Sequence, residues 1–207
     1  MRRYLRISLL PALFLLVQAC SEAPKQAEKT QPPAKPPEPV TGRYAFHQMY
    51  IAARSWAPDV MVLNLASIPL PEVQSVPGKA GAWQATFVSE SRGRARMYTY
   101  SVVESAGNLH KGVFSGSEEQ FSGQRGQQRP FLAEALKTDS DEVYKEALKH
   151  AAEYDKKHPG MIITFVLEST PRFPDPAWRV IWGESVSTSN FSVYIDATTG
   201  KYLQTMR

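Results

Sequence analysis

The feature that most constrains the fold is a pattern that occurs twice along the chain. Each copy has a segment with the apolar spacing of a helix, a mainly apolar strand and a proline-broken loop. A strand follows that begins with tryptophan and has apolar residues at alternate positions. Val62 corresponds to Ile163, Trp83 to Trp178 and Gly107 to Gly200, at offsets of 93 to 101 positions. We therefore predict an internal duplication.

Both copies indicate the same fold class. The first copy predicts a helix from residue 41 to 57 and strands at 60–68, 83–87 and 97–103. In the second copy, Asp139 and Glu142 have the spacing of a capping box at a helix start. A helix followed by antiparallel strands must cover one face of their sheet. The predicted fold is α+β, with two tandem repeats that each pack a helix on a small antiparallel sheet.

The N-terminal segment has the order of a secretory signal. Arg2, Arg3 and Arg6 precede an apolar run from Ile7 to Val17, which is too short for a spanning helix of roughly 20 residues. The run ends in Leu16-Val17-Gln18-Ala19-Cys20, which resembles the lipobox of bacterial lipoproteins. The resemblance implies cleavage before Cys20, its acylation (palmitate among the chains) and anchoring on the exported side of the membrane. Ser21 implies the outer membrane, facing the periplasm, if the cell is Gram-negative.

A proline-rich segment follows the cysteine. Residues 21–40 contain six prolines and no aromatic residue, so they cannot bury enough apolar area to offset the entropy of ordering. We expect a passive, extended tether. Three of the 24 Lys and Arg residues precede Cys20, so cleavage lowers the formal charge from +4 to +1. A charge of this size gives no support to a nucleic-acid partner.

The predicted organisation has five parts: a lipoprotein signal peptide at 1–19, the lipidated cysteine and tether at 20–40, a first unit at 41–114, a connecting segment at 115–138 and a second unit at 139–207.

The second unit resembles a known domain family. The segments 178–182 and 193–203, including the turn from Asp196 to Gly200, are similar to the end of a PepSY domain, whose last hairpin commonly carries an Asp-x-x-Thr-Gly turn. The first unit retains the pattern but has Glu104-Ser-Ala-Gly107 in place of that turn. The resemblance implies the α+β fold and a role in restraining peptidases or binding envelope partners.

Few residues suggest catalysis or metal binding. Asp196 and Gly200 have the pattern of a structural turn, in which the aspartate bonds its own backbone and the glycine supplies a positive φ. Glu142, Glu146, His150 and Glu153 share one side of the second helix, but interleaved lysines at salt-bridge spacing favour a solvated face over a metal site. The sequence contains no known catalytic or phosphate-binding motif. We therefore expect no enzyme activity, no catalytic residue, no metal and no cofactor.

Three alternating arginines form the candidate ligand site. On a strand or hairpin tip, Arg92, Arg94 and Arg96 share a face, next to Tyr98 and Tyr100, and guanidinium groups bind carboxylate or phosphate bidentately. The alternative is that these charges only keep a strand soluble and unpaired. For the tryptophans, core packing is the default interpretation.

The predicted function is therefore that of a membrane-anchored, non-enzymatic envelope binding protein. Its predicted partners are membrane lipid, through acylated Cys20, and an envelope protein such as a peptidase. The alternative is an accessory structural lipoprotein that binds peptidoglycan or a lipid head group through the arginine face.

Overall fold

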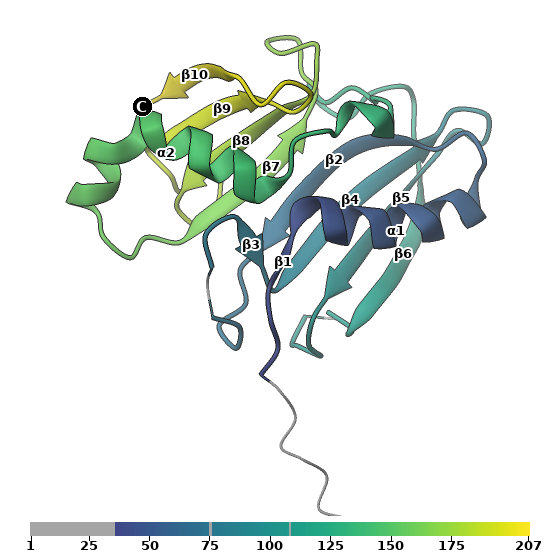
Figure 1. Cartoon of the computed structure of the whole chain (residues 1–207). Coiled ribbons are helices and arrows are strands. Elements are labelled where there is room, and N and C mark those ends of the chain that lie inside the picture. The colour runs from purple at the N-terminus through teal and green to yellow at the C-terminus, as the bar shows by residue number, and fades with distance from the viewer. Residues whose placement is uncertain (1–35, 75, 108) are drawn as a thin grey trace, which may run out of the picture. The chain divides into compact units, whose positions relative to one another are not determined.

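The computed structural model describes residues 36–74, 76–107 and 109–207 (Figure 1). The predicted signal peptide, Cys20 and most of the tether lie outside these residues. Residues 36–207 form one compact unit. Its elements are β1 (Val40–Thr41), α1 (Gly42–Trp56), β2 (Met61–Ile68), β3 (Lys79–Ala80), β4 (Ala82–Ser89), β5 (Arg94–Ser101), β6 (Gly112–Gln120), a 3-10 turn (Ala133–Ala135), α2 (Ser140–Lys157), β7 (Ile163–Glu168), β8 (Ala177–Trp182), β9 (Ser192–Asp196) and β10 (Tyr202–Met206).

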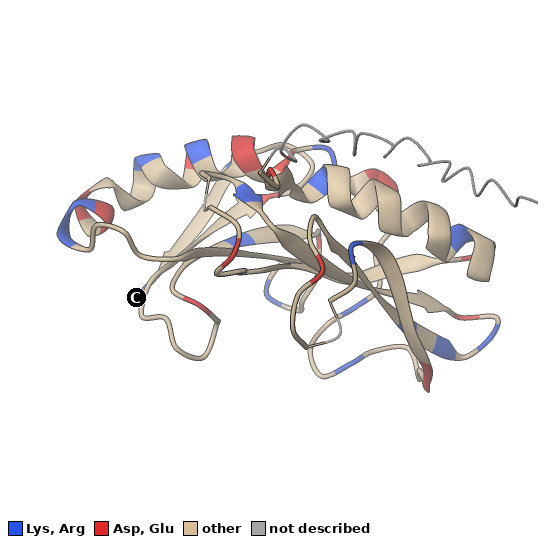
Figure 2. Ribbon diagram, turned by 90° about the horizontal axis from the view of Figure 1, so that it is seen from below, with Lys and Arg blue, Asp and Glu red and all other residues tan. Residues whose placement is uncertain are grey.

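The fold is α+β, with two helices and a large antiparallel sheet in the described residues. Among the described residues, eight of the ten strands form this sheet in the order β10-β9-β8-β7-β2-β4-β5-β6, and β1 and β3 pair in a separate two-stranded sheet. Both helices lie on the same face of this sheet (Figure 2). In each half of the unit, a helix precedes four long strands, and the halves meet where β2 pairs with β7.

The sheet differs from the predicted arrangement in two respects. The sequence predicted a separate small sheet for each unit, whereas β2 and β7 join the halves into one sheet. The pairing removes two unpaired strand edges, which are a liability when exposed. In addition, β6 continues to Gln120, six residues into the segment predicted as a connection. Its Ser, Gly and Glu content suits a solvent-facing edge strand, which composition alone does not distinguish from a loop.

Local sequence explains both helices. In α1, Ala45, Met49 and Ala53 are fully buried at helical spacing. Pro58 follows shortly after its end and cannot continue a helix. The predicted capping box of α2 is confirmed, because the side chains of Asp139 and Glu142 bond the main chain of the first turn.

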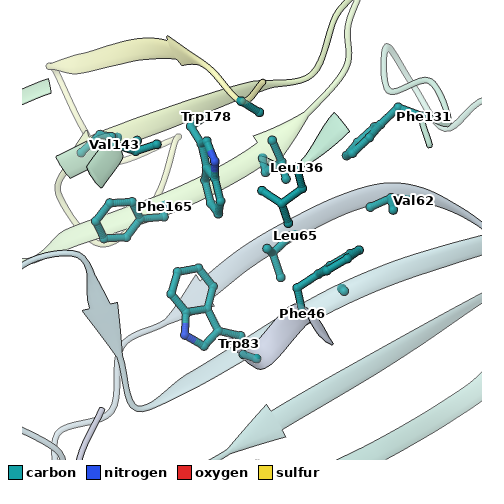
Figure 3. Packing of buried hydrophobic residues seen from close by; sticks show 14 of the residues in the cluster. Phe46, Val62, Leu65, Trp83, Phe131, Leu136, Val143, Phe165 and Trp178 are labelled. Carbon is teal, nitrogen blue, oxygen red and sulfur yellow. The ribbon is translucent and has the colours of Figure 1, made fainter. Parts of the chain in front are cut away.

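The core centres on two tryptophans, one from each half. Trp83 and Trp178 are fully buried, and their rings meet edge to face with centroids 6.3 Å apart (Figure 3). The indole Nε1 of Trp83 donates to the carbonyl of Val40, and that of Trp178 to the carbonyl of Thr138, each at 3.1 Å. Each acceptor stands two residues before the first residue of a helix, so the two halves fix their helix starts in the same way.

The N-termini of α1 and α2 are joined directly. The N–H of Gly42 donates to Ser140 Oγ at 2.7 Å, and the same hydroxyl donates to the carbonyl of Gly78 at 2.6 Å. The N–H of Arg43 donates to Asp139 Oδ1 at 2.9 Å. The carboxylate that begins α2 therefore also satisfies a free N–H in the first turn of α1.

Candidate functional site

The acidic face of α2 is an ion-paired surface. Lys149 bonds Glu146 at 2.6 Å, Lys145 lies 3.8 Å from Asp141, and His150 lies 3.5 Å from Glu146. The bond from Lys149 lowers the pKa of Glu146. Within residues 36–207, apart from 75 and 108, no group of three His, Cys, Asp or Glu side chains has the geometry of a metal site.

Asp196 lies in the turn between β9 and β10. Its Oδ1 accepts hydrogen bonds from the N–H groups of Thr198 and Thr199 at 2.9 and 2.7 Å. Gly200 follows with φ of 70°, a conformation that side chains disfavour. The carboxylate thus holds the turn.

The predicted arginine site is divided between a turn and a strand. Arg92 lies in the turn before β5, where its guanidinium donates to the carbonyl of Trp56 at 3.3 Å and pairs with Glu118 at 3.4 Å. Arg96 lies on β5 and donates to the carbonyl of Gly116 at 2.8 Å. Two of the three guanidinium groups therefore have partners within the protein. Arg94 lies beside a hollow of about 340 Å³ that Arg92 also lines.

The tyrosines of this region are packed against the helix side of the sheet. Tyr98 is 2% exposed and meets Phe87 edge to face, and the guanidinium of Arg96 lies 5.7 Å from its ring centroid. Tyr100 packs against Tyr44. Burial raises the pKa of both β5 tyrosines. The structure thus brings Arg96 and Tyr98 together, but as part of the packing between β5 and α1.

A different region has the features of a binding groove: the place where the two halves separate. Pairing between β2 and β7 covers only residues 64–66 and 166–168, although both strands continue beyond it. At the next position, the N–H of Phe165 donates to the hydroxyl of Ser67 at 2.9 Å. Pro69, the residue directly after the end of β2, has no N–H to donate. The strands accordingly diverge toward the end of β2 and the start of β7 (Figure 1).

We name the cavity at this divergence the seam groove. It has a volume of about 600 Å³, within the usual range for ligand sites. A second hollow of about 390 Å³ shares Ser67 and Glu184 with it and continues along Ala66, Val166 and Ile181. The principal residues of the seam groove are Ser67, Leu70, Val73, Lys79, Ile163 and Glu184.

The seam groove combines an apolar lining with two charged side chains. Leu70 and Val73 are buried, whereas Ile162 is 41% exposed. The side chains of Lys79 and Glu184 are exposed, and neither has an ion pair or hydrogen bond with any residue that the structure describes. An apolar lining that also contains an ammonium and a carboxylate suits a ligand that carries both charges together with an apolar part.

Sequence reasoning missed this groove. Its two charges come from positions 79 and 184, which only the pairing of the halves brings together. The available signal was the proline-broken loop after β2, because Pro69 marks where the ladder must end.

Comparisons with known proteins supply no family. No family model and no curated protein matches the chain. One solved structure, a candidate lipoprotein from Clostridium difficile 630, is similar with a TM-score of 0.48 and 9% identity, covering 78% of this chain and 91% of that one. Among the described residues, neither helix has the length and apolar character needed to cross a membrane.

Proposed function

We propose that this protein is a membrane-anchored, non-enzymatic binding protein of the cell envelope that holds a segment of a partner protein in the seam groove. The carrying observation is the groove itself, whose mainly apolar lining also contains Lys79 and Glu184, two charged side chains with no partner among the residues that the structure describes. On α2, by contrast, most of the charged side chains are paired with neighbours. Opposite charges in the lining of an apolar groove give orientation and specificity to a bound chain.

The anchor and the partner class rest on sequence resemblance. The lipobox-like segment ending at Cys20 supports acylation, and the proline-rich segment supports a tether. The helix and four strands of each half, with the matching bonds from Trp83 and Trp178, support tandem PepSY-like units. On this basis, we propose that the partner is an envelope peptidase, and that this protein restrains the peptidase and does not cleave it.

The structure favours the groove over the arginine face as the binding site. Binding of a phosphate or carboxylate by all three arginines requires Arg92 and Arg96 to leave their present partners. Lys79 and Glu184 have no partner among the described residues that a ligand would have to displace.

The proposal is tested with the full-length chain and a phage library of random octapeptides. The test variant is the double substitution Lys79→Ala/Glu184→Ala. The matched control is Lys157→Ala/Glu90→Ala, which removes the same two charges from exposed positions outside the groove. We expect selected peptides to bind the groove variant at least tenfold more weakly than the control variant, by fluorescence anisotropy. Equal affinity for both variants, or no selected peptide, overturns the proposal.

A further inference from the structure

We infer that the bound segment enters the seam groove as an additional β-strand, which pairs its main chain with Ile163. The inference rests on the proposed function, because it specifies how the same groove takes its occupant.

The main chain of Ile163 is available for such pairing. The N–H of Phe165 points toward β2, where it reaches Ser67 Oγ. Residues two apart in a strand direct their N–H and C=O groups to the same side. Ile163 therefore directs both groups into the gap, while the carbonyl of Ile162 points the other way and accepts from Gly183 at 2.8 Å. The pairing with β2 does not reach Ile163.

The opposite wall cannot close this gap. Continuing the observed register, in which Ala66 is opposite Val166, places Pro69 opposite Ile163. Proline has no N–H for the carbonyl of Ile163 to accept from. The Ser67 hydroxyl also stands between the strands in place of a direct main-chain bond. The result is a short open sheet edge inside a groove, which is the setting for strand addition by a peptide.

Charge complementarity defines the occupant. We assign it as an extended segment of a partner protein, with an acidic residue for Lys79, a basic residue for Glu184 and an apolar residue for Leu70 and Val73. The main chain supplies affinity through Ile163, and the side chains supply the choice of sequence.

The first test uses the tightest octapeptide from the library, synthesised with each amide N–H replaced in turn by N-methyl. Strand addition on one edge uses alternate amides. Because Ile163 offers one carbonyl, we expect at least a tenfold loss at the single amide that donates to it and less than a threefold loss at the two neighbouring amides, which point away. Uniform tolerance of methylation overturns strand addition. If methylation is tolerated but Lys79→Ala/Glu184→Ala still weakens binding of that peptide, the proposed function stands without strand addition. If the double substitution also leaves binding unchanged, both proposals fail.

The second test closes the gap from the protein side. Pro69→Val restores an N–H opposite Ile163, whereas Pro77→Val is a matched change in the same loop outside the groove lining. We expect Pro69→Val to weaken the octapeptide at least tenfold and to slow hydrogen exchange of the Ile163 amide in the free protein. Pro77→Val should change neither. Unchanged affinity of Pro69→Val, or weakening equal to that of Pro77→Val, contradicts the inference.

Discussion

Replacing Gly42 with alanine is expected to destabilise the protein by about 1–2 kcal/mol, although alanine is normally the better residue in a helix. A Cβ at this position would lie 2.8 Å from Cη2 of Trp178 and 3.1 Å from Cη2 of Trp83. Carbon atoms in favourable contact are about 3.5–4.0 Å apart. Gly42 is thus the point where α1 touches both central indoles.

The magnitude follows from how firmly the indoles are held. Both rings are fully buried, and each is tied to a carbonyl by its Nε1 at 3.1 Å. Neither ring can move aside without stretching that bond. Overpacking of this kind costs about 1–3 kcal/mol, and the gain in helix propensity offsets up to about 1 kcal/mol.

Urea unfolding followed by far-ultraviolet circular dichroism measures the effect. Trp178→Phe removes the closest atom, so the cost of Gly42→Ala should fall by at least half in that background. Gly116→Ala is the control, because its Cβ would have ordinary contact at 3.4 Å. A Gly42→Ala protein as stable as the wild type, or an equal cost in both backgrounds, would refute the steric argument.

Three further changes test other parts of the fold. Asp139→Ala, which removes the cap at both helix N-termini, should lower the free energy of unfolding by about 1–2 kcal/mol in the same urea assay. The Ser89 hydroxyl is the main cause that lowers the pKa of Asp59 from 3.8 to about 2. The charged form is therefore favoured in the folded state, so stability should fall as the pH drops from about 4 to 2, and Asp59→Asn should flatten this part of a pH series of urea midpoints. Gly200→Ala should cost about 1–2 kcal/mol, because φ is 70° and the Cβ would lie 3.3 Å from a threonine side chain. Gly126→Ala, at φ of 59° with open space around it, should lose only the backbone part of that cost.

Local patterns in the sequence predicted the elements well. The capping box at Asp139 and the apolar stripe of α2 are short-range features, so their physical causes are contained in a few consecutive residues. The alternation in 178–182 likewise predicted the burial of Trp178 and Trp182, which are both fully buried.

The pairing of strands from the two halves could not be predicted from the sequence. The contact of β2 with β7 joins residues about 100 positions apart, and no local pattern specifies which strand edges meet. The same limit applies to Arg96. Alternation predicted its side of the strand, but only the position of β6 shows that its guanidinium bonds the carbonyl of Gly116. The two charges of the seam groove, Lys79 and Glu184, likewise come together only through the long-range pairing of the two halves.

The attachment of Val40 also determines how the protein bears mechanical load. Force applied to the residues before Pro36 reaches the folded unit at Val40–Thr41, where two residues pair with β3 and the carbonyl of Val40 holds the Trp83 indole. Tension on the chain is thereby delivered to the junction of the two halves rather than to an outer strand. Extraction of β1 would withdraw a bond from the centre of the core, so pulling from the N-terminal side should unfold both halves in one event.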